Sequence, residues 1–76
     1  MLSNKLGKNL KMHREQHHMN QSCLAKKLNV QRQTISAYER GVSTPNIFIL
    51  IQMADIYNLT LDELVGREVP PKRVQH

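Results

Sequence analysis

The sequence predicts an all-α fold, a compact bundle of five short helices. Apolar residues recur at three- and four-residue spacing in successive segments, as one buried face of a helix requires. Residues that favour helix ends, such as asparagine, threonine and glycine, stand between these segments. A chain of 76 residues suffices for one domain. We therefore expect residues 1–66 to form the domain and residues 67–76, with two prolines, to form a short flexible tail.

The first two helices follow from their capping residues. Ser3 can cap the first helix, which should run to about Glu15 or His17. Asn20 is a good N-cap for a second helix over Gln21–Leu28. The spacing places the inward positions of these two helices at Leu6, Leu10, His13 or Arg14, His17, Leu24, Ala25 and Leu28.

A third helix should begin one or two residues after a short turn. Asn29 ends the second helix, because asparagine tolerates the left-handed conformation better than most residues. The third helix then runs from Gln31 or Arg32 to Arg40, and Gly41 is the residue expected just past a helix end.

The fourth and fifth helices complete the bundle. Thr44 followed by Pro45 indicates an N-cap and a proline in the first helical position, and the helix should continue through Tyr57. Its first apolar run has strand propensity, but the cap, the proline and the polar continuation favour a helix. Thr60 and Glu63 fit a capping box at the start of a short fifth helix. The core residues expected from the fourth helix are Ile47, Leu50, Ala54 and Met53.

The second and third helices form the most informative unit, a predicted helix-turn-helix. A tight crossing needs a small residue, which Ala25 supplies, and a positive φ in the turn, which Asn29 can adopt. The apolar wedge between the helices consists of Leu24, Leu28, Val30, Ile35 and Tyr38. With Ile35 and Tyr38 inward, the outward face of the third helix carries Arg32, Gln33, Ser36, Ala37 and Arg40. Arginine, glutamine and small side chains of this kind read base edges in a major groove, and no acid on this face repels phosphate.

The segments Asn20–Val30 and Thr34–Gly41 resemble the Xre family of helix-turn-helix proteins, which includes the lambdoid phage repressors and Cro proteins. The residues after them are similar too: Pro45, then Leu50 to Ala54, then Leu61-Asp62-Glu63-Leu64. The resemblance covers about residues 6–66. It implies a lambda-repressor-like DNA-binding domain. Two positions depart from the family pattern, because Asn29 stands where glycine is usual and Gln31 stands where a serine or threonine cap is common.

The resemblance also implies roles for individual residues. Gln21, Arg40, Ser43 and Thr44 match positions that contact the DNA backbone. Gln31, Arg32, Gln33, Ser36 and Ala37 stand at or beside base-facing positions; as a poor cap, Gln31 is expected to face DNA. Arg14 and Glu39 match a largely buried ion pair that ties the first helix to the third in some family members. For Arg32 and Gln33 the alternative is an exposed polar side chain that touches only phosphate, and for Arg40 it is a solvated charge. For Arg14 and Glu39 the alternative is two separate surface charges.

Composition supports a polyanionic partner. The formal net charge is +5 and the pI about 9.8. A basic solvated surface is the alternative that charge alone leaves open. The chain has no Trp, one Phe and no long apolar span, so we expect no membrane partner. One cysteine and the absence of a signal peptide in the polar first 21 residues favour the cytoplasm. The resemblance to the Xre family implies a prokaryotic or phage-encoded protein that is associated with the nucleoid.

Chemistry beyond binding is not predicted. Cys23 has no second cysteine to resolve it, and we expect a small, partly buried residue there. His13 and His17 share a helix face and His18 follows, but no suitably spaced acid or thiol completes a metal site. No nucleophile–base pair, phosphate loop or carboxylate pair is visible, so we expect no enzyme, no metal and no cofactor.

The fourth helix has more apolar residues than one core needs. We expect part of the set Phe48, Ile49 and Ile51 to be exposed and to form a homodimer interface; a tighter core that absorbs all three is the alternative. The function predicted is a dimeric repressor on a palindromic DNA operator, with activation left open. A second class stays open, a protein-partner module such as an antitoxin that uses the helix-turn-helix for autoregulation.

Overall fold

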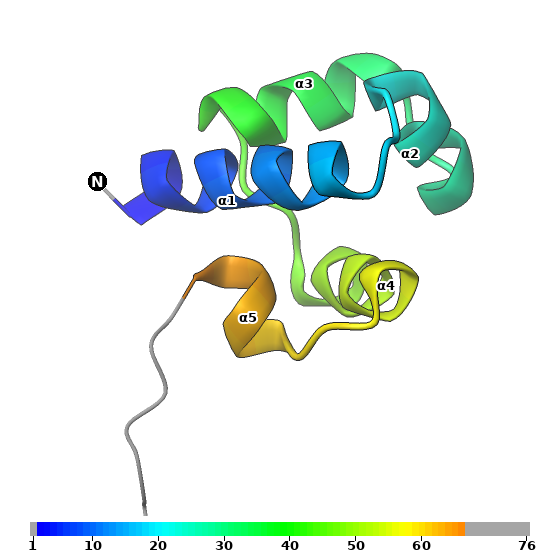
Figure 1. Ribbon diagram of the computed structural model, residues 1–76. Helices are drawn as coiled ribbons and strands as arrows, with labels where there is room; N and C mark the ends of the chain where they lie inside the picture. The colour runs from blue at the N-terminus through cyan, green and yellow to red at the C-terminus, as the bar shows by residue number, and fades with distance from the viewer. Residues whose placement is uncertain (1, 67–76) are drawn as a thin grey trace, which may run out of the picture.

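Five helices joined by short turns make up the computed structural model, which describes residues 2–66 (Figure 1). They are α1 (Leu2–Gln16), α2 (Gln21–Leu28), α3 (Arg32–Arg40), α4 (Ile47–Tyr57) and α5 (Leu61–Val65). No strand occurs among the described residues, and the all-α prediction is confirmed. The expected tail, residues 67–76, lies outside the described residues.

The first three helices form one layer of the molecule. In Figure 1, α1 lies alongside α3, and α2 packs against α3 beyond the end of α1. Gly7 lets α1 approach the backbone of α3: a β-carbon there would lie only 2.5 Å from the Glu39 carbonyl oxygen and 2.7 Å from that of Tyr38. The close pairing of α1 with the last turn of α3 therefore depends on the missing side chain at Gly7.

The last two helices lie below this layer and close the core (Figure 1). The α5 helix contacts both α1 and α4. Two side chains of α1 bind its carbonyl groups: Asn9 Nδ2 donates to the Val65 oxygen at 3.0 Å, and His13 Nε2 lies 3.1 Å from the Glu63 oxygen. Because the last carbonyls of a helix have no intrahelical partner, these contacts anchor the short α5.

Every helix contributes one of the largest fully buried side chains. They are Leu10, Leu24, Ile35, Met53 and Leu64, one each from α1 to α5 in order. Burial of each such side chain stabilises the fold by about 1.5–3 kcal/mol. The core thus joins all five helices, which holds the helix-turn-helix on a rigid support.

Several predicted helix ends are confirmed. The Asn20 side chain accepts a hydrogen bond from the Cys23 amide at 2.7 Å, and Thr60 and Glu63 form the capping box. Gly41 ends α3 with a φ of 76°. The sequence did not single out Asn58, which ends α4 with a φ of 58°.

Two predicted helix starts are wrong. The α1 helix begins at Leu2, so Ser3 lies inside it and is not its cap; helix ends commonly differ from expectation by a residue or two. The cap of α4 is Asn46, whose side chain accepts from the Ile49 amide at 3.0 Å. Asparagine caps at least as well as threonine, and Pro45 is buried before the helix instead of opening it.

Two predictions of burial are also wrong. Ile47 was expected in the core but is 50% exposed, because α4 starts there and its buried face is formed by Met53, Ala54 and Tyr57. Cys23 was expected to be partly buried but is exposed. It lies on the outer face of α2, since Leu24, Ala25 and Leu28 form the inner stripe.

Tyr57 gives a prediction for alkaline pH. Its side chain is buried against the ring of His17, with 4.6 Å between ring centroids, and its hydroxyl makes no hydrogen bond with the described residues. Burial raises the pKa of Tyr57 from 10.0 to about 12. The unfolded chain therefore ionises first, so Tyr57 contributes full stability below about pH 10 and loses it as the pH rises to about 12.

We expect Tyr57→Phe to flatten the decline of the unfolding free energy between about pH 10 and 12. Urea titrations at several pH values measure it. Tyr38→Phe is the matched control, since it removes another buried phenol but leaves Tyr57 in place. An equally steep decline in Tyr57→Phe and in the parent protein would contradict the assignment.

Candidate nucleic-acid interface

A tight turn sets the angle between α2 and α3. Asn29 adopts the left-handed conformation, with φ 58° and ψ 46°, as the sequence predicts. The Val30 amide donates to the Ala25 carbonyl at 3.0 Å across this turn. Ala25 is only 4% exposed, as a residue at a close helix crossing must be. The two helices therefore form the predicted helix-turn-helix.

The outward face of α3 is polar and accessible. Gln31, Arg32, Gln33 and Arg40 are exposed, whereas Ser36 and Ala37 are partly exposed. Arg40 Nε donates to Ser36 Oγ at 3.1 Å, which joins two of these side chains. The face carries no acidic side chain, because Glu39 points away from it into the contact with α1.

The start of α3 leaves its first backbone amides without a side-chain partner. Gln31 is the N-cap and its side chain makes no capping hydrogen bond. Neither α2 nor α3 has an acid in its first turn, whereas α5 has Asp62 and Glu63 there. The positive end of α3 is thus left available to an external anion such as a phosphate, whereas at the start of α2 the Asn20 side chain already binds the Cys23 amide.

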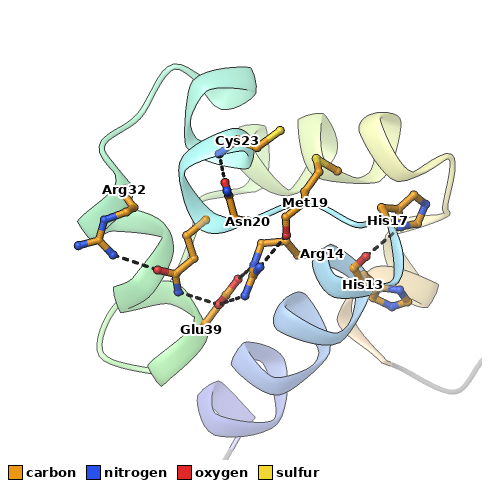
Figure 2. Close-up of polar contacts among 9 residues, drawn as sticks. His13, Arg14, His17, Met19, Asn20, Cys23, Arg32 and Glu39 are labelled. Carbon is orange, nitrogen blue, oxygen red and sulfur yellow. Dashed lines mark hydrogen bonds and ion pairs between the residues drawn. The ribbon is translucent and has the colours of Figure 1, made fainter.

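A buried ion pair ties the helix-turn-helix to α1 (Figure 2). Arg14 binds Glu39 with two hydrogen bonds, Nε to Oε2 at 2.6 Å and Nη2 to Oε1 at 3.1 Å. Their side chains are 8% and 4% exposed. Arg14 Nη1 also donates to the Met19 carbonyl at 2.7 Å. The hydrogen bonds that Arg14 donates to Glu39 raise the pKa of Arg14 above its usual value, so the guanidinium stays charged.

The network continues from Glu39 to the surface. Gln21 Nε2 donates to Glu39 Oε1 at 3.0 Å, and Arg32 Nη1 donates to Gln21 Oε1 at 3.1 Å. The sequence predicts separate roles for Gln21, Glu39 and Arg32 and does not predict the contacts of Gln21 with the other two. Gln21 and Arg32 stand eleven positions apart on different helices, and only the crossing angle brings them together.

Residues after α3 extend the polar surface. Ser43 and Thr44 are exposed in the loop that follows Gly41. The amides of Val42 and Ser43 both donate to the Ala37 carbonyl, at 2.9 and 3.3 Å, which holds this loop against the end of α3.

Charge is divided between the two layers. Residues 2–40, which span α1 to α3, contain eight lysines and arginines and two glutamates. Residues 41–66, which span α4 and α5, contain three acids and no lysine or arginine. Within residues 2–66 the positive charge therefore lies on the layer that presents α3.

An apolar surface lies on α4. Ile47, Phe48 and Ile51 are 50%, 73% and 42% exposed, and we call these three residues the α4 patch. Ile49, which the sequence grouped with Phe48 and Ile51, is partly buried and packs against the core. No helix among residues 2–66 is long and apolar enough to cross a membrane.

Comparison with known proteins agrees with this architecture. The helix-turn-helix family model HTH_3 matches residues 10–64. The HTH-type transcriptional regulator ImmR of Bacillus subtilis (strain 168) is 34% identical over 68 residues, which cover 90% of this chain and 54% of ImmR. The uncharacterized HTH-type transcriptional regulator MJ0272 of Methanocaldococcus jannaschii is 36% identical over 55 residues, 72% of this chain and 83% of that protein.

A solved structure is similar as well. The crystal structure of a transcriptional regulator from Listeria innocua matches with a TM-score of 0.76 at 35% identity, over 88% of this chain and 64% of that one. The chain thus spans about half the length of ImmR and less than two thirds of the Listeria protein. The match to the family model covers most of the chain and includes both helices of the motif. The protein belongs to the Xre family of helix-turn-helix proteins.

Proposed function

We propose that this protein is a transcriptional regulator that binds double-stranded DNA in a sequence-specific manner, as a dimeric repressor on a palindromic operator. The observation that carries the proposal is the exposed, acid-free face of α3 on the basic layer of the molecule. Arginine and glutamine side chains on such a helix can bind base edges in the major groove. The names of the relatives support the same activity, since each is named as a transcriptional regulator.

The two kinds of contact divide over the surface. Gln31, Arg32 and Gln33 at the start of α3, with Ser36 and Ala37, read bases in this proposal. Gln21, Arg40, Ser43 and Thr44 contact phosphates, and the uncapped start of α3 assists them. The bound DNA would place the protein in the cytoplasm, and neither a cofactor nor a metal takes part.

Selection from random duplexes tests the proposal. The protein is incubated with a pool of random double-stranded DNA at about 150 mM salt, and the bound fraction is sequenced. An enriched palindrome with half-sites about one helical turn apart is the expected result. Binding without an enriched motif, falling steeply with salt, would show phosphate contact alone and overturn sequence-specific function.

Arg32 should set one position of the motif. We expect Arg32→Ala to weaken binding to the selected site by about 1–3 kcal/mol and to relax the preference at one base pair in each half-site. Lys27→Ala, which removes an exposed charge from α2, is the matched control and should leave the motif unchanged. An unaltered motif and affinity in Arg32→Ala would show that the register assigned to α3 is wrong.

The α4 patch supports the dimer. Three apolar side chains are exposed together on a helix that carries no basic residue, so a second copy can approach there without bringing the basic layers together. Ile49 belongs to the same helix and is partly buried against the core. Phe48, Ile49 and Ile51 therefore remain the proposed interface, with Ile47 added.

Phe48→Gln tests the dimer. We expect it to shift the protein from dimer to monomer in sedimentation at tens of micromolar, because Phe48 is the most exposed large apolar side chain of the described residues. Met12→Gln removes an apolar side chain that is 41% exposed on α1 and should leave the dimer intact. A monomeric parent protein at that concentration would count against the interface.

The same patch favours a second candidate, a module that binds another protein, as an antitoxin binds its toxin. In that case the parent protein sediments as a monomer alone and forms a tight complex with the product of a neighbouring gene. Phe48→Gln would then weaken the heterocomplex and leave DNA selection unchanged.

A further inference from the structure

The side chain of Arg40 is held one turn back along α3. Arg40 is the last residue of the helix, and its Nε donates to Ser36 Oγ at 3.1 Å. Four residues of an α-helix span about 6 Å along the axis, so this contact brings the guanidinium from the end of α3 to the level of its middle. Long side chains on a helix commonly point toward its N-terminus in this way. Arg40 is therefore directed along the outward face of α3.

The end of α3 does not need Arg40 as a cap. A basic side chain near the end of a helix can bind the last carbonyl groups, which have no intrahelical partner. Here the Ala37 carbonyl accepts a hydrogen bond from the Val42 amide at 2.9 Å. The Tyr38 carbonyl accepts one from the Gly41 amide at 3.2 Å. Because the following loop satisfies these carbonyls with its own backbone, the Arg40 side chain is available to the outward face.

The position over Ser36 is better suited to a base contact than the end of the helix. In a helix-turn-helix, the residues toward the start of the second helix contact base edges, and the contact with Ser36 moves the guanidinium in that direction. Ser36 and Ala37 are small and partly exposed, so they leave room for a base pair to approach. The single acid of α3, Glu39, is bound to Arg14 and does not compete for the guanidinium.

The hydrogen bond to Ser36 leaves one edge of the guanidinium for DNA. Nε is occupied, whereas Nη1 and Nη2 carry N–H groups that can bind two acceptors side by side. Guanine offers such a pair, O6 and N7, in the major groove, and this is the commonest specific contact of a side chain with a base. The bond to Ser36 is exposed to water in the free protein. Entry of α3 into a groove removes that water and strengthens the bond.

We propose that Arg40 reads a guanine in each half-site through Nη1 and Nη2, and that Ser36 is the positioning residue that directs it. This inference rests on the proposed DNA-binding function. It gives Arg40 a specificity role beyond a phosphate contact, and it makes Ser36 act through Arg40. The operator then contains a second base pair read by arginine, different from the one that Arg32 reads.

Arg40→Lys tests the base contact, because lysine keeps the positive charge but lacks the planar pair of nitrogens. In selection from random duplexes, we expect the preference for guanine at one base pair of each half-site to fall about threefold or more. This base pair should differ from the one relaxed by Arg32→Ala, and the other positions should be retained. A side chain that only contacts phosphate would leave the motif unchanged, and that result would overturn the proposal.

Ser36→Ala tests the positioning role, since it removes Oγ and leaves Arg40 in place. We expect the same guanine preference to fall, and Ser36→Thr, which restores a hydroxyl, to recover it. In an Arg40→Lys background, Ser36→Ala should change the preference no further. A motif unchanged by Ser36→Ala would exclude positioning. A preference lost at another base pair would show that Ser36 reads a base itself, which also overturns its role through Arg40.

Failure of the two proposals is distinguishable. If the parent protein enriches no motif, the proposed function fails and the inference fails with it. If it enriches a motif that Arg40→Lys and Ser36→Ala both retain, sequence-specific binding stands and the base contact of Arg40 alone is wrong.

Discussion

Arg14→Met should lower the free energy of unfolding by about 3–5 kcal/mol, the usual effect of removing one partner of a buried ion pair. Glu39, whose side chain is 4% exposed in the parent protein, would keep Gln21 as its donor, and the Met19 carbonyl would lose its bond from Nη1. For a domain of this size the melting temperature should fall by at least about 12 °C. Urea denaturation and thermal melting at neutral pH measure the change.

The double variant Arg14→Met with Glu39→Met separates charge burial from packing. We expect it to be more stable than Arg14→Met alone, because no uncompensated carboxylate stays inside. If the double variant were the less stable of the two, the cost of Arg14→Met would come from lost packing of the long arginine side chain.

Gly7→Ala is the second substitution with a large expected effect. Its β-carbon would lie within 3.0 Å of the backbone of Tyr38 and Glu39, and backbone atoms cannot rotate away as a side chain can. Overpacking of this kind costs about 3 kcal/mol, of which alanine's better helix propensity offsets up to about 1 kcal/mol. We expect a net loss of about 2 kcal/mol in the free energy of unfolding, measured by urea denaturation.

The neighbouring exposed residue supplies the control. Lys8→Ala introduces the same side chain on α1 and should change stability by about 0.5 kcal/mol or less. A Gly7→Ala variant as stable as Lys8→Ala would mean that α1 and α3 separate without loss, and that the close approach at Gly7 is not needed.

The local elements were predictable because their signals are local. The turn at Asn29, the cap at Asn20 and the capping box from Thr60 to Glu63 each depend on residues within one or two turns. The inner and outer faces of α3 followed from helical spacing around Ile35 and Tyr38. These local features are sufficient to predict the helix-turn-helix without any long-range contact.

The wrong and missing predictions have a different origin, because they concern features that depend on tertiary packing. Asn46 and Thr44 are both good caps, and the helix starts after Asn46, with Pro45 buried before it. The exposure of Ile47 follows from that choice, since the helix starts later. Helical spacing could not reveal the contact of Gln21 with Arg32, which depends on the angle between two helices.

The uneven distribution of charge between the layers has a consequence for the approach to DNA. Among residues 2–66, a positive layer opposite a negative one contributes an electric dipole moment in addition to the net charge. In the field of a polyanion the molecule would rotate before contact, so that the α1–α3 layer leads. Collisions in which the α4–α5 layer meets DNA first become rarer. At low ionic strength the association rate constant therefore rises above that of a molecule with the same net charge but no dipole moment.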